Sequence, residues 1–314
     1  MRRARAPSPE RLRDLLTYHA TLLADGMRNR AFYRALRARV RPGSSVLDLG
    51  AGSGIWAVVA ARLGARRVVA VEREPLLVPV IERLARENRV ADRVTVVQGD
   101  ARRLRLRRRF DVVVSETVGN EGFDEGIVPL LFDARRRFLK RGGALVPQAV
   151  SLRCAPVRPF VAGIRPRLAA DRSFLELARH VPQLFPPGKV ATLSPGATLR
   201  RVDLRTARPP LVLEGLSARF RLRDGRALGG FVLWVEMDLA PGVRLSTRAT
   251  TSWWRTFLPV EPVGPGPCAV TIELSKGRVG TRWRVVVERR GRHESRDYSA
   301  LFAYGALRGG NSKR

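Results

Sequence analysis

Three glycines in a short segment have the spacing of a ligand-binding turn. Residues 45–49 are predicted to form a strand and residues 55–63 a helix, and Gly50, Gly52 and Gly54 occupy the turn between them. Such a turn lets the backbone approach a ligand closely and directs the first N–H groups of the helix toward it. Glu72 ends the next predicted strand about twenty residues later, where a carboxylate can accept hydrogen bonds from both hydroxyls of a ribose. The pattern predicts a site for a ribose-containing cofactor.

The glycine spacing argues against a nicotinamide dinucleotide as that cofactor. The dinucleotide fingerprint requires a glycine five positions after the first, and this position holds Ile55. Residues 46–50 instead resemble the first motif of class I methyltransferases, in which an acid such as Asp48 precedes the first glycine by two residues. This resemblance implies S-adenosyl-L-methionine as cofactor, and it implies that Asp100 and Ala101, after the third predicted strand, contact adenine. A solvated surface role for Asp100 is the alternative.

Two further carboxylates follow the fourth predicted strand, residues 110–114. Glu116 lies at the carboxyl end of this strand, where open α/β sheets bind ligands, and Glu125 follows nine residues later. The loop resembles the double-Glu loop of the protein arginine methyltransferase family, which implies that both residues are catalytic and hold the substrate. Two carboxylates suit a planar guanidinium, because they can form bidentate charge-assisted hydrogen bonds with it. The alternative is that they only cap or solvate the loop.

The resemblance extends to the segment that precedes the glycine turn. Residues 19–28 are similar to the N-terminal helix of the family, which implies that His19 and Arg28 contact the cofactor. It also implies that Asp25 lies beside the active site and takes part in catalysis. The family exit from the Rossmann domain is similar to residues 135–147.

A more distant segment departs from the family pattern. Residues 251–257 lie where the family carries a Thr-His-Trp loop, which implies that Ser252 and Trp253 are near the substrate. Ser252 replaces the histidine, so the usual dyad with Asp25 cannot form. Asp25 would then act alone or not at all.

The elements that must position these residues indicate an α/β fold. We expect a helical N-terminal cap over residues 1–44, because apolar residues recur there at helical spacing. Short strands alternate with helices over residues 45–147, which predicts a Rossmann-like domain with a parallel sheet. Its last helix is expected over residues 126–139, with residues 140–143 as the basic and glycine-rich C-cap.

The second half of the chain has a different texture. Residues 148–314 contain alternating β-branched runs broken by proline and glycine, which predicts an antiparallel barrel or sandwich as the substrate domain. Residues 160–190 form an apolar, proline-bounded and more helical insertion. This insertion resembles the place of the family's dimerisation arm, which implies a homodimer.

Composition limits the remaining possibilities. The chain has 59 Lys and Arg against 28 Asp and Glu, a net charge of +31, which favours a polyanion partner such as RNA. Only four of the basic residues are lysine, a bias that a G- and C-rich coding sequence also produces. Two cysteines and three histidines show no metal-ligand spacing, so we expect no metal and a reduced, cytoplasmic protein. No apolar run is long enough for a membrane span or a secretory signal.

These observations lead to one expected function and two rivals. We expect methyl transfer from S-adenosyl-L-methionine to an arginine guanidinium in a protein or peptide, or to a similar cationic nitrogen. The first rival is a methyltransferase of a small cationic molecule or natural-product peptide. The second is an inactive cofactor-binding module with a nucleic-acid-binding surface, favoured by Ser252 and by the charge.

Overall fold

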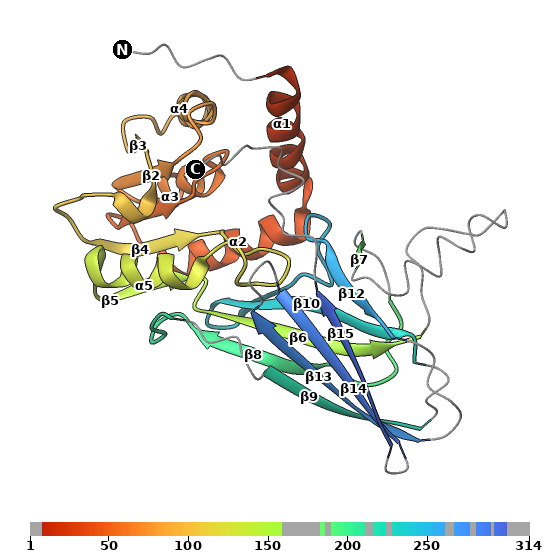
Figure 1. Ribbon diagram of the computed structural model, residues 1–314. Helices are drawn as coiled ribbons and strands as arrows, with labels where there is room; N and C mark the ends of the chain where they lie inside the picture. Colours follow the sequence, from red (N-terminus) through yellow and green to blue (C-terminus); the bar gives the residue numbers. More distant parts are fainter. Residues whose placement is uncertain are drawn as a thin grey trace. The chain divides into compact units, whose positions relative to one another are not determined.

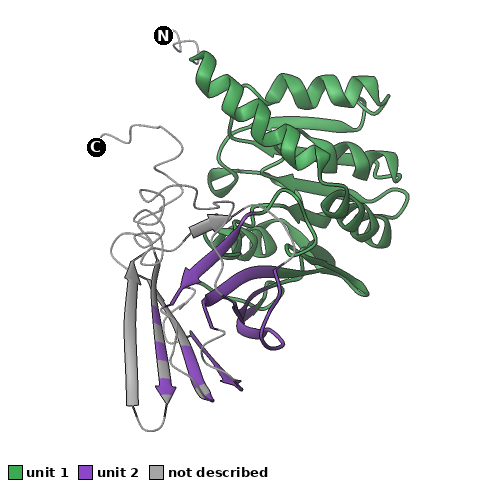
Figure 2. Cartoon of the chain, turned by 90° about the vertical axis from the view of Figure 1, so that its right-hand side faces the viewer, with its two compact units in different colours: residues 1–150, 202–209, 236–253 green, residues 151–201, 210–235, 254–314 purple. Residues whose placement is uncertain are grey.

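The computed structural model describes residues 8–158, 183–185, 190–210, 216–223, 228–260, 267–276, 281–289 and 292–299. The chain forms two compact units, which Figure 2 distinguishes by colour. Unit 1 consists of residues 1–150, 202–209 and 236–253, and unit 2 of residues 151–201, 210–235 and 254–314. The first segment of unit 1 therefore ends at Val150, and two later segments of the chain also belong to this unit. The domain boundary predicted from the sequence is at residue 147.

Two helices form the N-terminal part of unit 1, where the sequence suggested one helical cap. Helix α1 (Pro9–Ala24) begins at Ser8, whose Oγ accepts a hydrogen bond from Arg11 N, and helix α2 (Gly26–Arg39) begins at Asp25. The Asp25 carboxylate accepts from Arg28 N at 3.0 Å, as an N-cap does. This cap starts a new helix at the point where α1 ends. Helix α2 buries Phe32 and Leu36, whereas α1 buries no residue.

A five-stranded parallel sheet forms the centre of unit 1 (Figure 1). Its strands are β1 (Ser45–Leu49), β2 (Arg67–Glu72), β3 (Val94–Gln98), β4 (Phe110–Ser115) and β5 (Leu139–Val146). Their order is β3-β2-β1-β4-β5, and each neighbouring pair is parallel. The connections include α3 (Ile55–Arg62), α4 (Val78–Glu87), the short 3-10 helix η1 (Ala101–Arg103) and α5 (Ile127–Arg137). This arrangement confirms the predicted Rossmann-like fold.

The strand order brings two of the predicted site segments to the same edge of the sheet. The order reverses between β1 and β4, and Leu49 of β1 pairs with Ser115 of β4. The glycine turn follows Leu49, and Glu116 follows Ser115. Both therefore begin at neighbouring carboxyl ends, at the topological switch point where such sheets bind ligands.

The predicted end of the last Rossmann helix was wrong. Helix α5 ends at Arg137, and residues 140–143 belong to strand β5 instead of forming a C-cap. Phe138 is buried, and its carbonyl accepts a hydrogen bond from Phe110 N at 2.7 Å. Leu139 and Ala144 pair with β4 on either side of residues 140–143, which lie at a register shift in the strand. This flanking pairing outweighs the local preference of the basic residues and glycines.

The second half of the chain is antiparallel β structure, as the fold class predicted. One sheet has the order β7-β12-β10-β6-β8, with β11 paired to β10, and a four-stranded sheet has the order β15-β14-β13-β9. The strands of the first sheet are β6 (Ala149–Val157), β7 (Gln183–Phe185), β8 (Ala197–Asp203), β10 (Gly230–Ala240), β11 (Val243–Ser246) and β12 (Arg255–Pro259). Those of the second are β9 (Leu216–Leu222), β13 (Cys268–Lys276), β14 (Thr281–Arg289) and β15 (Arg292–Ser299).

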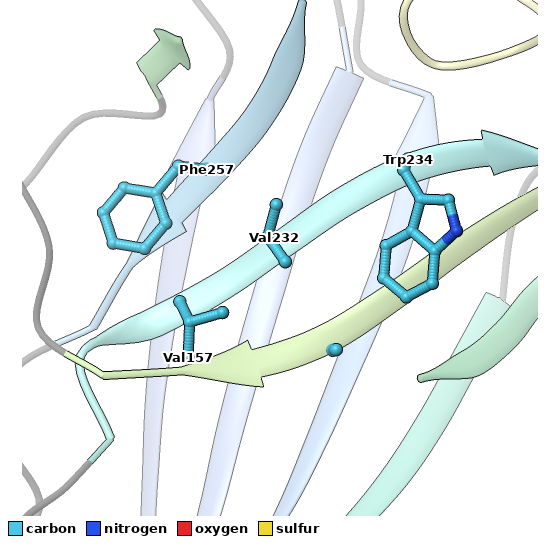
Figure 3. Packing of buried hydrophobic residues seen from close by; sticks show 5 residues of the cluster. Val157, Val232, Trp234 and Phe257 are labelled. Atoms are coloured by element: carbon cyan, nitrogen blue, oxygen red, sulfur yellow. The ribbon is translucent and has the colours of Figure 1, made fainter. Parts of the chain in front are cut away.

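A hydrophobic cluster within unit 2 joins the strands of the first sheet (Figure 3). It includes Val157 of β6, Val232 and Trp234 of β10, and Phe257 of β12, all of them buried. Gly196 is required beside this cluster, since a Cβ at this position would lie 2.2 Å from the Trp234 ring. Burial of these large side chains fixes the register of the strands.

The described residues bear only in part on the predicted dimerisation arm and on the expected absence of a membrane span. Most of the predicted dimerisation arm, residues 160–190, lies outside the described residues, and within it β7 pairs with β12. Among the described helices, none is both long enough and apolar enough to cross a membrane.

Candidate functional site

The glycine turn is closed on one side by helix α1. Gly52 has a φ of 56°, and a Cβ at this position would lie 2.9 Å from Cε1 of His19. Gly50 and Gly54 have φ values of 71° and 82°, which also favour glycine. The sequence therefore needs glycine here both for the turn and for the contact with His19. The structure therefore brings His19, which was predicted to contact the cofactor, next to the glycine turn.

Glu72, at the end of β2, is fixed by the main chain. Its Oε2 accepts a hydrogen bond from Gly52 N and its Oε1 accepts one from Glu74 N, both at 2.7 Å. The side chain is buried. Each carboxylate oxygen has a further lone pair, so a carboxylate held in this way can still accept from two ribose hydroxyls. The arrangement fits the predicted cofactor.

Asp48, the residue before the last of β1, is a buried carboxylate that forms no hydrogen bond of normal geometry in the described part of the chain. It is 1% exposed. Burial raises the pKa of Asp48 to about 7; the Ala57 amide opposes this rise, and Glu72 and Glu116 add to it. A ligand with N–H donors or positive charge would satisfy such a group. Asp48 therefore also fits the sulfonium cofactor.

Asp100 caps the 3-10 helix η1. Its carboxylate accepts hydrogen bonds from Arg102 N at 2.9 Å and from the Arg102 guanidinium at 2.7 and 3.1 Å. These bonds from Arg102 lower the pKa of Asp100 to about 2. Ala101 follows as the first residue of η1 and is half-buried. The adenine contact of both residues stays a prediction, because Asp100 is engaged with Arg102 here.

Glu116 binds a guanidinium of the protein itself. Nη2 of Arg28 donates to Oε2 of Glu116, and the two side chains are 4% and 9% exposed. Burial raises the pKa of Glu116, while the charge and the hydrogen bond of Arg28 oppose that rise. The pair joins helix α2 to the end of β4. It brings together a predicted cofactor contact and a predicted catalytic residue.

Aromatic rings surround the guanidinium of Arg28. Its Cζ lies 5.8 Å from the ring centroid of Phe32, 5.3 Å from that of Trp56 and 5.9 Å from that of Trp253. These distances are within the range of cation–π attraction. Sequence reasoning missed Phe32 and Trp56. Phe32 follows Arg28 by one helical turn, a spacing that could have indicated it.

The loop after Glu116 is anchored near its start, whereas Glu125 lies near its end. Nε1 of Trp253 donates to the carbonyl of Val118 at 2.7 Å, so the predicted substrate-side tryptophan holds this loop. Glu125 occupies the turn before Gly126, the N-cap of α5, and its side chain is exposed. Thus one of the two predicted clamp residues is buried and the other is open to solvent.

Asp25 is buried and accepts four hydrogen bonds. Its Oδ1 accepts from Arg28 N, and its Oδ2 accepts from Thr251 N and Ser252 N at 2.9 Å and from Ser252 Oγ at 2.7 Å. Burial acts to raise the pKa of Asp25, but these hydrogen bonds hold it below the usual value. Ser252 therefore contacts Asp25 as a donor, in place of the histidine that the family carries. A group of three or more metal-binding side chains is absent from the described residues.

The sequence of the chain matches several methyltransferases. The sequence profile of the family described as ribosomal protein L11 methyltransferase (PrmA) matches residues 31–146. An arginine N(omega)-methyltransferase of Streptomyces achromogenes subsp. streptozoticus is 30% identical over 280 residues, which cover 84% of this chain and 77% of that protein. Protein arginine N-methyltransferase PRMT10 of Oryza sativa subsp. japonica is 36% identical over 172 residues, 54% of this chain but only 43% of that protein.

Solved structures share the fold at lower sequence identity. The PRMT1 enzyme-prozyme heterotetrameric complex of Trypanosoma brucei with AdoHcy has a TM-score of 0.73 at 18% identity and covers 89% of this chain and 96% of that chain. Protein arginine methyltransferase 10 of Arabidopsis thaliana has a TM-score of 0.73 at 19% identity and covers 91% and 99%. Together with the extent of the Streptomyces match, the sequence and the fold give one conclusion: the chain belongs to the protein arginine methyltransferase family of S-adenosylmethionine-dependent N-methyltransferases.

Proposed function

We propose that the chain transfers a methyl group from S-adenosylmethionine to a guanidinium nitrogen of arginine held by Glu116. The observation that carries this proposal is the pair between Glu116 and Arg28. Oε2 of Glu116 already accepts a hydrogen bond from a guanidinium in a buried environment. A carboxylate that binds one guanidinium there has the charge and geometry to bind a second through its other oxygen.

The cofactor is assigned to the glycine turn. Gly50, Gly52 and Gly54 allow its close approach, Glu72 accepts from its ribose, and His19 with Asp48 completes the surroundings. When bound, S-adenosylmethionine supplies an electrophilic methyl group on a sulfonium.

Glu116 and Glu125 have different roles in this proposal. Glu116, buried beside Arg28, binds the guanidinium N–H groups and holds the acceptor nitrogen in place, which supplies rate through orientation. Glu125, exposed at the end of the loop, binds the other side of the fork as the substrate enters. The nitrogen that gains a methyl group must lose a proton, and Glu116 suits that proton better than Asp25, because the pKa of Glu116 is raised and that of Asp25 is lowered.

Asp25 acts as a positioning residue in this proposal. Its four hydrogen bonds join the start of α2 to residues 251 and 252, while Trp253 holds Val118 in the loop after Glu116. The carboxylate therefore orients both Arg28 and the substrate loop. Ser252 supplies one of the donors and needs no proton chemistry of its own.

The second candidate is the same reaction on free arginine or another small cation. The relative that matches over 77% of its length is named an arginine, and not a protein arginine, methyltransferase. A net charge of +31 also opposes the approach of strongly basic peptides. An inactive cofactor-binding module is the third possibility, favoured by Ser252 in place of histidine.

One assay separates these three possibilities. The purified protein is incubated with methyl-labelled S-adenosylmethionine and, separately, with free L-arginine, with a neutral arginine-containing peptide and with a glycine- and arginine-rich peptide. Label in either peptide supports the first proposal, and label in free arginine alone supports the second. Both catalytic proposals are wrong if the cofactor binds but label enters none of these three substrates and no component of a whole-cell lysate.

We also propose a cytoplasmic homodimer. Helix α1 and the start of α2 leave Leu12, Leu16, Leu23 and Met27 between 39% and 53% exposed, an apolar surface that a second copy would cover. Light scattering at micromolar concentration should give about twice the mass of one chain. A monomeric mass at this concentration contradicts the proposal.

A further inference from the structure

The connection between β3 and β4, which can be followed in Figure 1, contains a dense run of arginines in its sequence. Within residues 102–109, six of the eight positions are arginine and none is acidic. All six arginines are exposed, whereas Leu104 inside the run and Phe110 after it are buried. The apolar residues thus face the protein and the charges remain at the surface.

Hydrogen bonds fasten this run to helix α5 and strand β5. Arg137 of α5 donates to the carbonyl oxygens of Leu104 and Arg102, and Arg109 donates to the carbonyl of Leu139 at 2.8 Å. The exposed Arg141 lies two residues beyond Leu139 on β5. It therefore extends the same basic surface. The backbone that carries these arginines is thus held in place by hydrogen bonds from arginine side chains to main-chain carbonyls.

Part of this charge is neutralised within the protein. Arg102 forms an ion pair with Asp100 at 2.7 Å, and Lys140 forms one with Asp111 at 2.9 Å. Of the other exposed arginines on this surface, Arg103 acts by its charge on Asp100 and Arg109 donates to a main-chain carbonyl. The remaining four form neither an ion pair nor a hydrogen bond in the part of the chain that the structure describes. We call them the arginine cluster, and they are Arg105, Arg107, Arg108 and Arg141. Holding like charges together without counter-charges costs free energy, which a bound polyanion relieves.

The position of the cluster separates it from the proposed active site. Arg107 and Arg108 lie three and two residues before Phe110, the first residue of β4, and Arg141 is near the start of β5. The glycine turn and Glu116 follow the opposite, carboxyl ends of their strands. A ligand at the cluster therefore leaves the cofactor turn accessible.

We propose that the arginine cluster binds the phosphate backbone of nucleic acid. Each guanidinium can hold a phosphate with two parallel hydrogen bonds, which lysine cannot do. An acidic protein fits the surface less well, because stable protein interfaces bury an apolar centre. Leu104 is buried and Leu106 is half-buried, so this surface offers charge around little exposed apolar area. Recognition through phosphates implies little preference for base sequence.

Two variants of equal net charge test the proposal. The cluster variant carries Arg105→Gln, Arg107→Gln, Arg108→Gln and Arg141→Gln. The control variant carries Gln at four exposed arginines elsewhere in unit 1, Arg34, Arg37, Arg66 and Arg86. Fluorescence anisotropy measures the binding of labelled single-stranded RNA, and of DNA of the same sequence, at several salt concentrations. Thermal melting and cofactor binding check that each variant is folded.

The cluster variant should bind RNA at least tenfold more weakly, and the slope of log K against log salt should fall by about three, since each phosphate contact in a single strand contributes about 0.7. The control should lose less than threefold, and DNA should behave like RNA. Equal loss in both variants, or no binding by the unchanged protein at low salt, overturns the proposal. Competition by polyglutamate as strong as that by unlabelled RNA instead indicates an acidic protein partner. If the cluster variant does not fold, Arg107→Gln with Arg108→Gln should reduce the slope by about half as much.

Discussion

The cofactor side and the substrate side of the site hold their carboxylates in different ways. Glu72 is fixed by two main-chain N–H groups, Gly52 N and Glu74 N, at positions that the strand and its turn determine. Glu116 is held by a side chain, the guanidinium of Arg28 from another helix. The proposed cofactor side is therefore preformed by the backbone, whereas the proposed substrate side depends on a long-range ion pair with a guanidinium, the same group as in the proposed substrate.

This difference predicts the largest effect for a change at Glu116. Glu116→Gln keeps the shape but turns N–H donors toward Arg28 and toward the bound guanidinium, and it removes the negative charge. Loss of such a charge-assisted bond costs about 2 to 4 kcal/mol, so transfer should fall about thirtyfold to nearly a thousandfold. Single-turnover assays with labelled cofactor measure the loss, and calorimetry should show cofactor binding within about threefold of the unchanged protein.

Glu121→Gln is the matched control for this change, because Glu121 lies in the same loop and is only half-buried. It should reduce transfer less than threefold. Normal turnover by Glu116→Gln would show that Glu116 does not bind a substrate guanidinium, and it would favour a substrate without positive charge.

A change at Glu72 should weaken cofactor binding, in contrast to a change at Glu116, which should reduce methyl transfer. Glu72→Ala removes the acceptors for the ribose and also leaves Gly52 N and Glu74 N without their partner. We expect cofactor affinity to fall about ten- to a hundredfold, the effect of one or two lost hydrogen bonds to a charged group. Calorimetry with S-adenosylmethionine measures it, with Glu87→Gln on the exposed face of α4 as control. Equal affinities for the variant and the unchanged protein would contradict the assignment of the ribose.

The comparison also explains how much could be predicted from the sequence. The parallel sheet and the glycine turn depend on alternating strands and helices and on three glycines, all of which are local patterns. Glu72 followed from its spacing to this turn, and Asp48 from the resemblance to the first motif of class I methyltransferases. The start of β5 could not be predicted, since residues 140–143 have the local preference of a helix end and belong to the strand because Leu139 before them and Ala144 after them pair with β4.

Contacts between distant segments were beyond the reach of sequence reasoning. Arg28 and Glu116 are 88 residues apart, and Asp25 and Ser252 are 227 residues apart. The resemblance placed each residue near the site, but it gave no protein partner for Glu116, and it linked position 252 to Asp25 only through a histidine that this chain lacks. Their pairing depends on burial, because an unpaired charge in these positions would be costly.

A buried carboxylate on the cofactor side gives a pH-dependent prediction. The pKa of Asp48 is about 7 in the folded, ligand-free protein against a usual 3.8, so the folded state binds more protons between these values. Stability therefore falls as the pH rises from about 4 to about 7. Asp48→Asn removes this loss, which a shift of this size limits to about 4 kcal/mol. Thermal melting should show that Asp48→Asn is more stable than the unchanged protein at pH 8 and no more stable at pH 4.

Asp14→Asn on the exposed surface of α1 is the control for this pH dependence and should show no such crossover. The same Asp48→Asn protein should bind S-adenosylmethionine more weakly, because an amide no longer attracts a cationic ligand. A melting difference that does not change with pH would mean that Asp48 titrates normally.

The smallest effect is expected at Ser252, where the positioning and the catalytic interpretations of Asp25 differ. Ser252→Ala removes one of four hydrogen bonds to Asp25 and leaves those from Arg28 N, Thr251 N and Ser252 N in place. The free energy of unfolding should fall by about 1 kcal/mol, and kcat should fall less than fivefold with an unchanged pH profile. Thr251→Ala is the matched control, since it keeps both main-chain bonds of this segment. A hundredfold loss of kcat in Ser252→Ala together with a shifted pH profile, and neither in Thr251→Ala, would show that Ser252 and Asp25 move a proton, and the positioning role would be wrong.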